Sequence, residues 1–174
     1  MRFFSSLTAV FAIVISVNAA YISKRAPANV ESCVSSFKYV STEIDELRTV
    51  VQDGGILDTG YAYHDLQRSI NSAQASCCSI NTVIAEVDSD YVIGVINTIT
   101  PKMQSALTLV ATKKDDYNIF TRVLVENRVK ELEKTTTHLN TCLNNFTPES
   151  KKSALQAYID AINLAFSSTI AAYD

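Results

Sequence analysis

The sequence predicts an all-α protein, a five-helix antiparallel bundle with two disulfides that follows a cleaved signal peptide. Three observations lead to this fold class. The 174 residues include only four glycines and three prolines, too few to supply turns for many strands. Apolar residues recur at intervals of three and four in five separate segments, the period of an amphipathic helix. Four cysteines, an even number, are typical of a disulfide-bonded secreted domain.

The amino terminus is predicted to be removed from the mature protein. In residues 1–19 a charged start, a short apolar run and small residues follow one another, as in a signal peptide. The apolar run covers about 15 residues, fewer than the roughly 20 that a membrane span needs. Lys24-Arg25 is a dibasic site of the kind cut in the secretory pathway. We therefore expect a short pro-segment, 20–25, and a single helical-bundle domain, 26–174.

The charge of the mature chain excludes some partners. Cleavage after Arg25 takes three basic residues from the 15 present, which leaves 12 against 18 acidic residues and a net charge of −6. An acidic chain without a dense basic cluster argues against binding to nucleic acid or to an anionic membrane surface. No later apolar run is long enough to predict a membrane span.

The first two helices are predicted as a hairpin. The first covers 29–51, and Asp53-Gly54-Gly55 ends it because glycine tolerates the turn that follows a helix. The second covers 61–87, with apolar residues at helical spacing throughout. Asp88-Ser89-Asp90 is the predicted connection to the third helix, with side chains suited to capping it.

The third helix, 91–110, is the most apolar of the five. Its apolar residues cover more than one stripe, so we expect burial around most of its circumference. Pro101 lies in its middle and is expected to kink it, since proline removes a backbone donor. Such a helix is either a central core element or the wall of an apolar cavity.

The last two helices complete the bundle. The fourth covers 118–145 and has a charged outer face, and the fifth begins at Thr147-Pro148-Glu149 and reaches Tyr173. The short connections predict that successive helices run antiparallel.

The cysteines lie where the predicted hairpins bring helix ends together. Cys33 is near the start of the first helix, Cys77 and Cys78 are late in the second, and Cys142 is near the end of the fourth. We expect Cys33 to join one member of the adjacent pair and Cys142 the other, and the sequence does not choose between the two pairings. No histidine or acid stands at ligand spacing beside them, so we expect no metal site.

The sequence offers no catalytic constellation. The two histidines, His64 and His138, have no nucleophile or second ligand at a recognisable spacing, and both are interpreted as surface residues. We expect a protein that is not an enzyme and needs no cofactor. The sequon Asn145-Phe146-Thr147 predicts a glycan on Asn145 in a secreted chain.

The order of these features resembles a known family. A secretion signal with a dibasic site leads into five helices, of which the third has an apolar–Pro–apolar centre and ends with Lys113-Lys114 before an aromatic residue. The fifth reads ALQAYIDAINLAFSSTIAAYD. Over 28–174 the chain resembles the fungal hydrophobic-surface-binding protein and cell-wall galactomannoprotein family. That resemblance implies a secreted extracellular or cell-wall bundle that encloses fatty acids or adsorbs to hydrophobic surfaces. Association with cell-wall polysaccharide is a further partner that it implies.

A lipid site can be placed on the predicted helices. A helix of about 20 residues is about 30 Å long, comparable with an extended acyl chain. We hypothesise a cavity between the third helix and the fourth and fifth, lined by Ile96, Ile99, Met103, Leu107, Phe120, Leu124, Leu155, Ile159, Ile162 and Phe166. The alternative is a secreted protein-interaction module, an inhibitor or effector, in which these residues form a dry core.

Overall fold

Helices make up nearly all of the described chain. The computed structural model describes residues 26–53 and 55–174, and the predicted signal peptide and pro-segment lie outside this part. Its elements are α1 (Ala28–Asp53), α2 (Ile56–Cys78), α3 (Glu86–Thr112), the short 3-10 helix η1 (Lys113–Asp116), α4 (Ile119–Phe146) and α5 (Glu149–Tyr173). No strand occurs within these residues. The predicted five-helix, all-α fold is confirmed.

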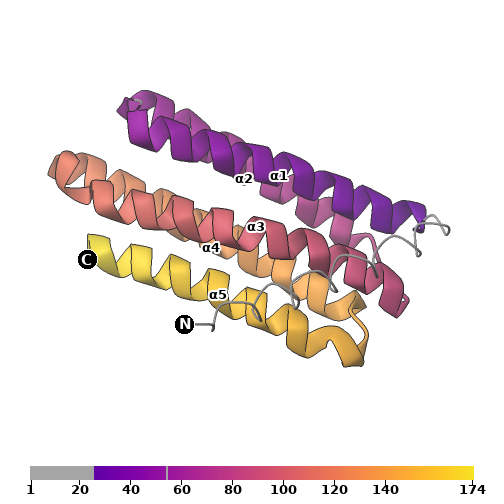
Figure 1. Cartoon of the computed structure of the whole chain (residues 1–174). Helices are drawn as coiled ribbons and strands as arrows, with labels where there is room; N and C mark the ends of the chain where they lie inside the picture. Colours follow the sequence, from indigo (N-terminus) through magenta and orange to yellow (C-terminus); the bar gives the residue numbers. More distant parts are fainter. Residues whose placement is uncertain (1–25, 54) are drawn as a thin grey trace, which may run out of the picture.

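The helices form two layers (Figure 1). One layer holds α1, α3 and α5, with α3 in the middle, and the other holds α2 and α4. At the two edges α1 packs on α2 and α4 packs on α5. Successive helices run antiparallel, as predicted, so helices within one layer run parallel (Figure 1). The hydroxyls of Thr169 and Tyr173 on α5 donate to the carbonyls of Leu107 and Val110 on α3, in the same order along both helices.

The core fills the space between the layers. Every long helix contributes a stripe of buried apolar side chains, among them Ile44, Leu66, Leu107, Leu132 and Leu155 at 1 % exposure or less. Burying a side chain of this size stabilises the fold by about 1.5–3 kcal/mol. No helix of residues 26–53 and 55–174 carries an apolar stretch long enough to cross a bilayer.

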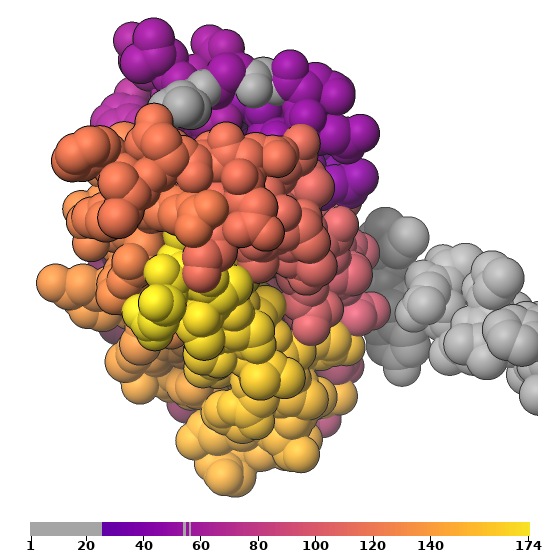
Figure 2. All heavy atoms as spheres, turned by 90° about the vertical axis from the view of Figure 1, so that its left-hand side faces the viewer, coloured from indigo at the N-terminus to yellow at the C-terminus, as the bar shows by residue number. Residues whose placement is uncertain are grey.

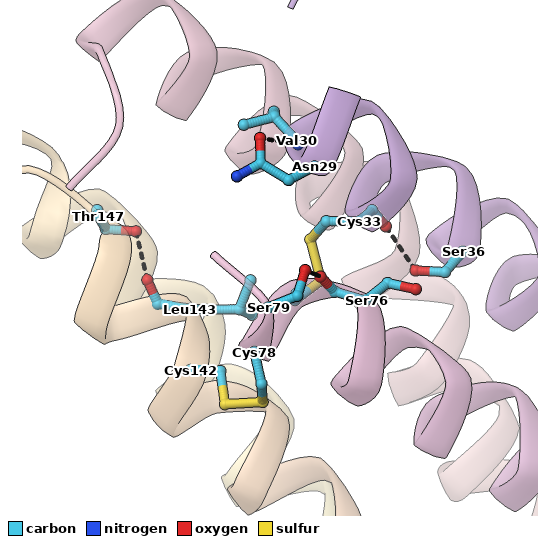
Figure 3. Close-up of a disulfide and its surroundings, with 11 residues drawn as sticks. Asn29, Val30, Cys33, Ser36, Ser76, Cys78, Ser79, Cys142, Leu143 and Thr147 are labelled. Carbon is cyan, nitrogen blue, oxygen red and sulfur yellow. Dashed lines mark hydrogen bonds between the residues drawn. A yellow bond between two sulfur atoms is a disulfide. The ribbon is translucent and has the colours of Figure 1, made fainter. Parts of the chain in front are cut away.

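Two disulfides lie at one end of the bundle, one between the two layers and one within the α2–α4 layer (Figure 3). Cys33 at the start of α1 is bonded to Cys77 at the end of α2, and Cys78 is bonded to Cys142 near the end of α4. Adjacent residues on a helix point about 100° apart, so the cysteine pair reaches two different neighbours. The α1–α2 disulfide is fully buried, whereas Cys78 of the α2–α4 disulfide is exposed. The expected sharing of the pair between Cys33 and Cys142 is confirmed.

The second helix and its connection differ from the prediction. α2 begins five residues earlier, at Ile56, and ends at Cys78 rather than at residue 87. Ile80 is buried although it lies in the connection, and the Ile84 amide donates to the Phe146 carbonyl over 2.9 Å. Both isoleucines lie in the loop between α2 and α3, where they pack against the core. Their helical spacing therefore led to a second helix that was predicted too long. The residues predicted to connect the two helices belong to α3, whose first turn gains from the acids Glu86 and Asp88.

The expectation that α3 is buried around most of its circumference is wrong. Because α3 is the middle helix of one layer, it faces α1, α5 and the core on one side and solvent on the other. Tyr91, Gly94, Asn97 and Pro101 lie on the exposed side. α3 is a continuous helix through Pro101, and the Asn97 carbonyl, which loses a helical partner there, is on the same exposed side where water can bond to it.

Candidate ligand-binding site

A cavity of about 390 Å³ opens between the first turns of α2 and α4. It lies at the end of these helices opposite the disulfides, and Figure 2 views the molecule from that end. The cavity is half open to solvent and mainly apolar, and its lining comes from α2, α4 and the residues just before α4. The lining residues are Leu57, Thr59, Gly60, Tyr61, Tyr63, His64, Tyr117, Thr121, Leu124, Val125 and Arg128.

Local hydrogen bonds fix the two helix starts that form this cavity. In α2 the Asp58 carboxylate accepts from the Gly55 amide, and the Thr59 hydroxyl donates to the Gly55 carbonyl. In α4 the Asn118 side chain caps the helix by accepting from the Thr121 amide over 3.0 Å. Once α4 begins there, a spacing of three and four places Thr121, Leu124, Val125 and Arg128 on one face toward α2.

The cavity has a buried side and an exposed rim. On the buried side lie Thr59, Tyr63, Thr121 and Val125, each less than 9 % exposed. The rim consists of side chains that are at least half exposed: Leu57, Tyr61, His64 and Leu124. Such large exposed apolar side chains around a cavity are typical of a site that binds an apolar molecule.

Two basic side chains, Arg128 and His64, belong to the lining. Arg128 carries a permanent positive charge and forms an ion pair with Glu131, one turn further along α4, over 2.9 Å. His64 lies 3.1 Å from Arg68 and 3.6 Å from Asp65, all on the surface of α2. Among the residues that the structure describes, no aspartate or glutamate lines the cavity. Because guanidinium binds carboxylate with charge-assisted hydrogen bonds, this arrangement favours an anionic head group at the mouth.

Tyr63 is the largest residue on the buried side. It is 2 % exposed, and its hydroxyl has no hydrogen-bond partner within the described residues. Burial, with smaller contributions from Tyr173 and Tyr117, raises the pKa of Tyr63 well above its usual value, so the hydroxyl stays protonated. Burial also raises the pKa of Tyr117, against the opposing effect of Lys113.

The ten residues predicted to line a lipid cavity divide into three groups. Leu124 lines the cavity described above. Phe120 does not face the third helix as expected: it is 85 % exposed, because the start of α4 directs this position outward, one turn before Leu124. The remaining eight are buried in the core without lining this cavity: Ile96, Ile99, Met103, Leu107, Leu155, Ile159, Ile162 and Phe166. A ligand-lining role for these eight stays a prediction.

The other predicted sites lie on the surface. His64 and His138 are both exposed, as expected. Asn145 is exposed on the last turn of α4, whereas the hydroxyl of Thr147 is buried and donates to the Leu143 carbonyl. Glycosylation of Asn145 stays a prediction. Within residues 26–53 and 55–174 no three histidine, cysteine or acidic side chains gather where they could hold a metal ion.

The α2 side of the cavity was not anticipated from the sequence. Leu57, Thr59 and Gly60 precede the predicted start of the second helix, so they were assigned to no face. The available signal was the spacing of the apolar residues Leu57 and Tyr61, which is one helical turn and continues the helical pattern toward the amino terminus.

Comparisons with known proteins identify the fold. A search of protein-family models finds no match, and neither does a search of curated protein sequences. Among solved structures the chain is similar to Afmp4p in complex with palmitic acid, with a TM-score of 0.77 and 20 % identity over 83 % of this chain and 99 % of that one. The chain has the same fold. It is also similar to two domains of the Penicillium marneffei MP1 protein.

Both MP1 domains were solved with arachidonic acid. Ligand binding domain 2 has a TM-score of 0.76 and 13 % identity over 86 % of this chain and 95 % of that one. Ligand binding domain 1 has a TM-score of 0.77 and 8 % identity over 84 % and 99 %. At these identities the likeness establishes the architecture of this chain. What each neighbour binds is a property of that neighbour.

Proposed function

We propose that this protein is a non-catalytic binder of long-chain fatty acids. The acyl chain occupies the cavity between α2 and α4, and the carboxylate pairs with Arg128 at the mouth. The observation that carries this proposal is the cavity itself: about 390 Å³, apolar, half open, and lined by an arginine but by no carboxylate. Ligand pockets are typically about 300–1,000 Å³, so the volume suits one small apolar ligand.

The energetics are those of a moderate binder. Burying about 14 methylenes at roughly 0.8 kcal/mol each gives a gross gain near 11 kcal/mol. Association costs about 4 kcal/mol or more. A half-exposed arginine–carboxylate pair adds at most about 1 kcal/mol. The remainder, about 8 kcal/mol, corresponds to a Kd of about 1 μM or weaker.

The structural neighbours support this ligand class. Afmp4p and two domains of the MP1 protein, all with this fold, were solved with palmitic or arachidonic acid bound. Their common ligand chemistry, a carboxylate on a long apolar chain, matches the combination of an apolar cavity and Arg128 in this chain.

Displacement of a fluorescent fatty acid by palmitate tests the proposal. Arg128→Gln should weaken palmitate binding about fivefold, which equals about 1 kcal/mol. It should leave binding of the uncharged alcohol hexadecanol unchanged, since that ligand has no carboxylate. Arg48→Gln, at an exposed arginine of α1 that does not line the cavity, is the matched control and should bind both ligands as the wild type does. Absence of palmitate binding to the wild-type protein would favour the protein-interaction alternative with a dry core.

A second candidate function is adsorption to hydrophobic surfaces. It is favoured by the exposed apolar side chains at the rim, Leu57, Tyr61 and Leu124, together with Phe120 beside them. Phe120→Ser should reduce the amount of protein retained on an alkyl-coated surface. Leu164→Ser removes an exposed leucine of α5, and this control should change retention less. Equal effects of the two substitutions would argue against a specific surface.

We also propose that the protein acts outside the cell, free or in the cell wall. The support is the signal-like sequence of residues 1–19 and the two disulfides, which persist in oxidising compartments. The mature protein should then begin at Ala26, which amino-terminal sequencing of the secreted product checks. Association with cell-wall polysaccharide is a further part of this proposal, and retention of the mature protein on purified wall polysaccharide would test it.

A further inference from the structure

We propose that Tyr63 forms the inner wall of the α2–α4 cavity and sets the length of the acyl chain that the protein accepts. This inference rests on the proposed function, because it assigns a specificity-determining role at the same site.

Tyr63 is the largest side chain on the buried side of the cavity. The other buried lining residues are two threonines and a valine, Thr59, Thr121 and Val125, which are much smaller. Tyr63 is among the largest fully buried side chains of the described residues. An acyl chain that enters past the exposed rim therefore meets the tyrosine ring as its largest obstacle.

The side chain of Tyr63, on α2, is part of the core that fills the space between the layers. Burial, and to a smaller extent Tyr173 of α5 and Tyr117, raises the pKa of its hydroxyl. Tyr173 in turn donates its own hydroxyl to the Val110 carbonyl at the end of α3 over 2.7 Å. Tyr63 thus belongs both to the lining of the cavity and to the apolar core.

Among the three buried wall residues with a hydroxyl, Tyr63 is the one held by packing alone. The Thr59 hydroxyl donates to the Gly55 carbonyl and the Thr121 hydroxyl lies 3.2 Å from the Asn118 side-chain oxygen, so both are fixed to the backbone or cap of their own helix. The Tyr63 hydroxyl has no such partner. Moving or shortening this side chain breaks no hydrogen bond, which makes it the residue that can alter the depth of the cavity.

The test is the affinity for a series of saturated fatty acids of increasing chain length. In the wild type each added methylene should tighten binding about fourfold, equivalent to about 0.8 kcal/mol, until the chain reaches the ring, after which the gain stops. In Tyr63→Leu the gain should continue to longer acids. In Tyr63→Phe, which keeps the ring, the gain should stop at the wild-type length. Tyr158→Leu shortens a half-buried tyrosine of α5 that does not line the cavity and serves as the matched control.

The outcomes separate this inference from the proposed function. Suppose the wild type binds fatty acids, but in Tyr63→Leu the affinity stops rising at the same chain length as in the wild type. Then the role of Tyr63 is wrong while fatty-acid binding stands. The same holds if Tyr63→Phe extends the longest chain length that still gains affinity as far as Tyr63→Leu does. If the wild type binds no fatty acid of any length, the proposed function fails and the inference fails with it.

A measurement on the wild-type protein does not depend on the variants folding. A fatty acid with a photoreactive diazirine on its terminal carbon should, after irradiation and peptide mapping by mass spectrometry, label Tyr63. An isomer with the diazirine beside the carboxylate should label α4 near Arg128 instead. Labelling of Tyr63 by the carboxylate-end isomer alone would overturn the inference.

Discussion

Two glycines provide the sharpest perturbation of the cavity. Gly60 lies in α2 and lines the cavity, whereas Gly94 lies in α3 on its exposed side. A Cβ added at either position meets no heavy atom within 4 Å outside its own helix backbone, so each site has room for a side chain. Leucine is about 0.8 kcal/mol better than glycine in a helix, and both Gly60→Leu and Gly94→Leu should therefore be slightly more stable than the wild type.

Only the first substitution should affect binding. A leucine side chain has four carbon groups, each about as large as the roughly 30 Å³ of a water molecule, so it fills on the order of 120 Å³. At Gly60 it would reduce the cavity from about 390 Å³ to roughly 270 Å³, below the about 300 Å³ of typical ligand sites. If its four carbons displace about four methylenes of the ligand, the loss is about 3 kcal/mol, or on the order of 100-fold in Kd.

The assay combines thermal unfolding with displacement of a fluorescent fatty acid. We expect both variants to melt at or above the wild-type temperature, Gly94→Leu to bind palmitate normally, and Gly60→Leu to bind it on the order of 100-fold more weakly. Normal binding by Gly60→Leu would refute the assignment of the cavity as the site. A comparable loss in Gly94→Leu would show that the effect does not act through the cavity.

Three further predictions concern buried polar groups and the cross-links. Thr136 has a buried hydroxyl without a hydrogen-bond partner, so Thr136→Val should raise the free energy of unfolding by about 1 kcal/mol in urea titrations. Thr169→Val loses hydrogen bonds to two carbonyls and should lower the free energy of unfolding by about 1–3 kcal/mol. Equal effects of the two substitutions would contradict this assignment. Because burial raises the pKa of Tyr63, its contribution to stability is intact below about pH 10, where tyrosine ionises in the unfolded chain, and falls above it by about 1.4 kcal/mol per pH unit. Tyr63→Phe should lessen that alkaline fall, and an unchanged fall would count against the burial effect. Replacing Cys78 and Cys142 by serine should cost about 4 kcal/mol for a separation of 64 residues. A mild reductant should open this exposed disulfide before the α1–α2 disulfide, as alkylation and mass spectrometry would show, and the reverse order would contradict the difference in burial.

The fold could be predicted from the sequence because its determinants are local and periodic. Three-and-four spacing identified all five helices, and the predicted end of the first helix lies within two residues of the end of α1 at Asp53. The cysteine pairing followed from helix direction, although the choice between Cys77 and Cys78 depends on the angle at which α2 ends. The apolar residues Ile80 and Ile84 have helical spacing but lie in a loop that packs on the core, so the second helix was predicted too long. A buried position requires an apolar side chain whether its backbone is helical or not.

The site was much less accessible to sequence reasoning. Apolarity singled out α3, yet α3 presents its apolar side to a packed core, and the cavity lies between α2 and α4. Whether apolar residues enclose space or fill it depends on how far two helices stand apart, which periodicity does not encode. Arg128 was assigned with its neighbours to a solvated charged face, because its position beside the cavity appears only when α4 is packed on α2.

The location of a bound acyl chain tests the central claim most directly. With methyl-labelled protein and unlabelled palmitate, isotope-filtered nuclear Overhauser spectra report which side chains touch the ligand. Binding in the α2–α4 cavity predicts contacts from the acyl chain to the methyl groups of Leu124 and Val125. Contacts to Ile99, Met103 and Leu155 without any to Leu124 or Val125 would contradict it and place the ligand between α3 and α5.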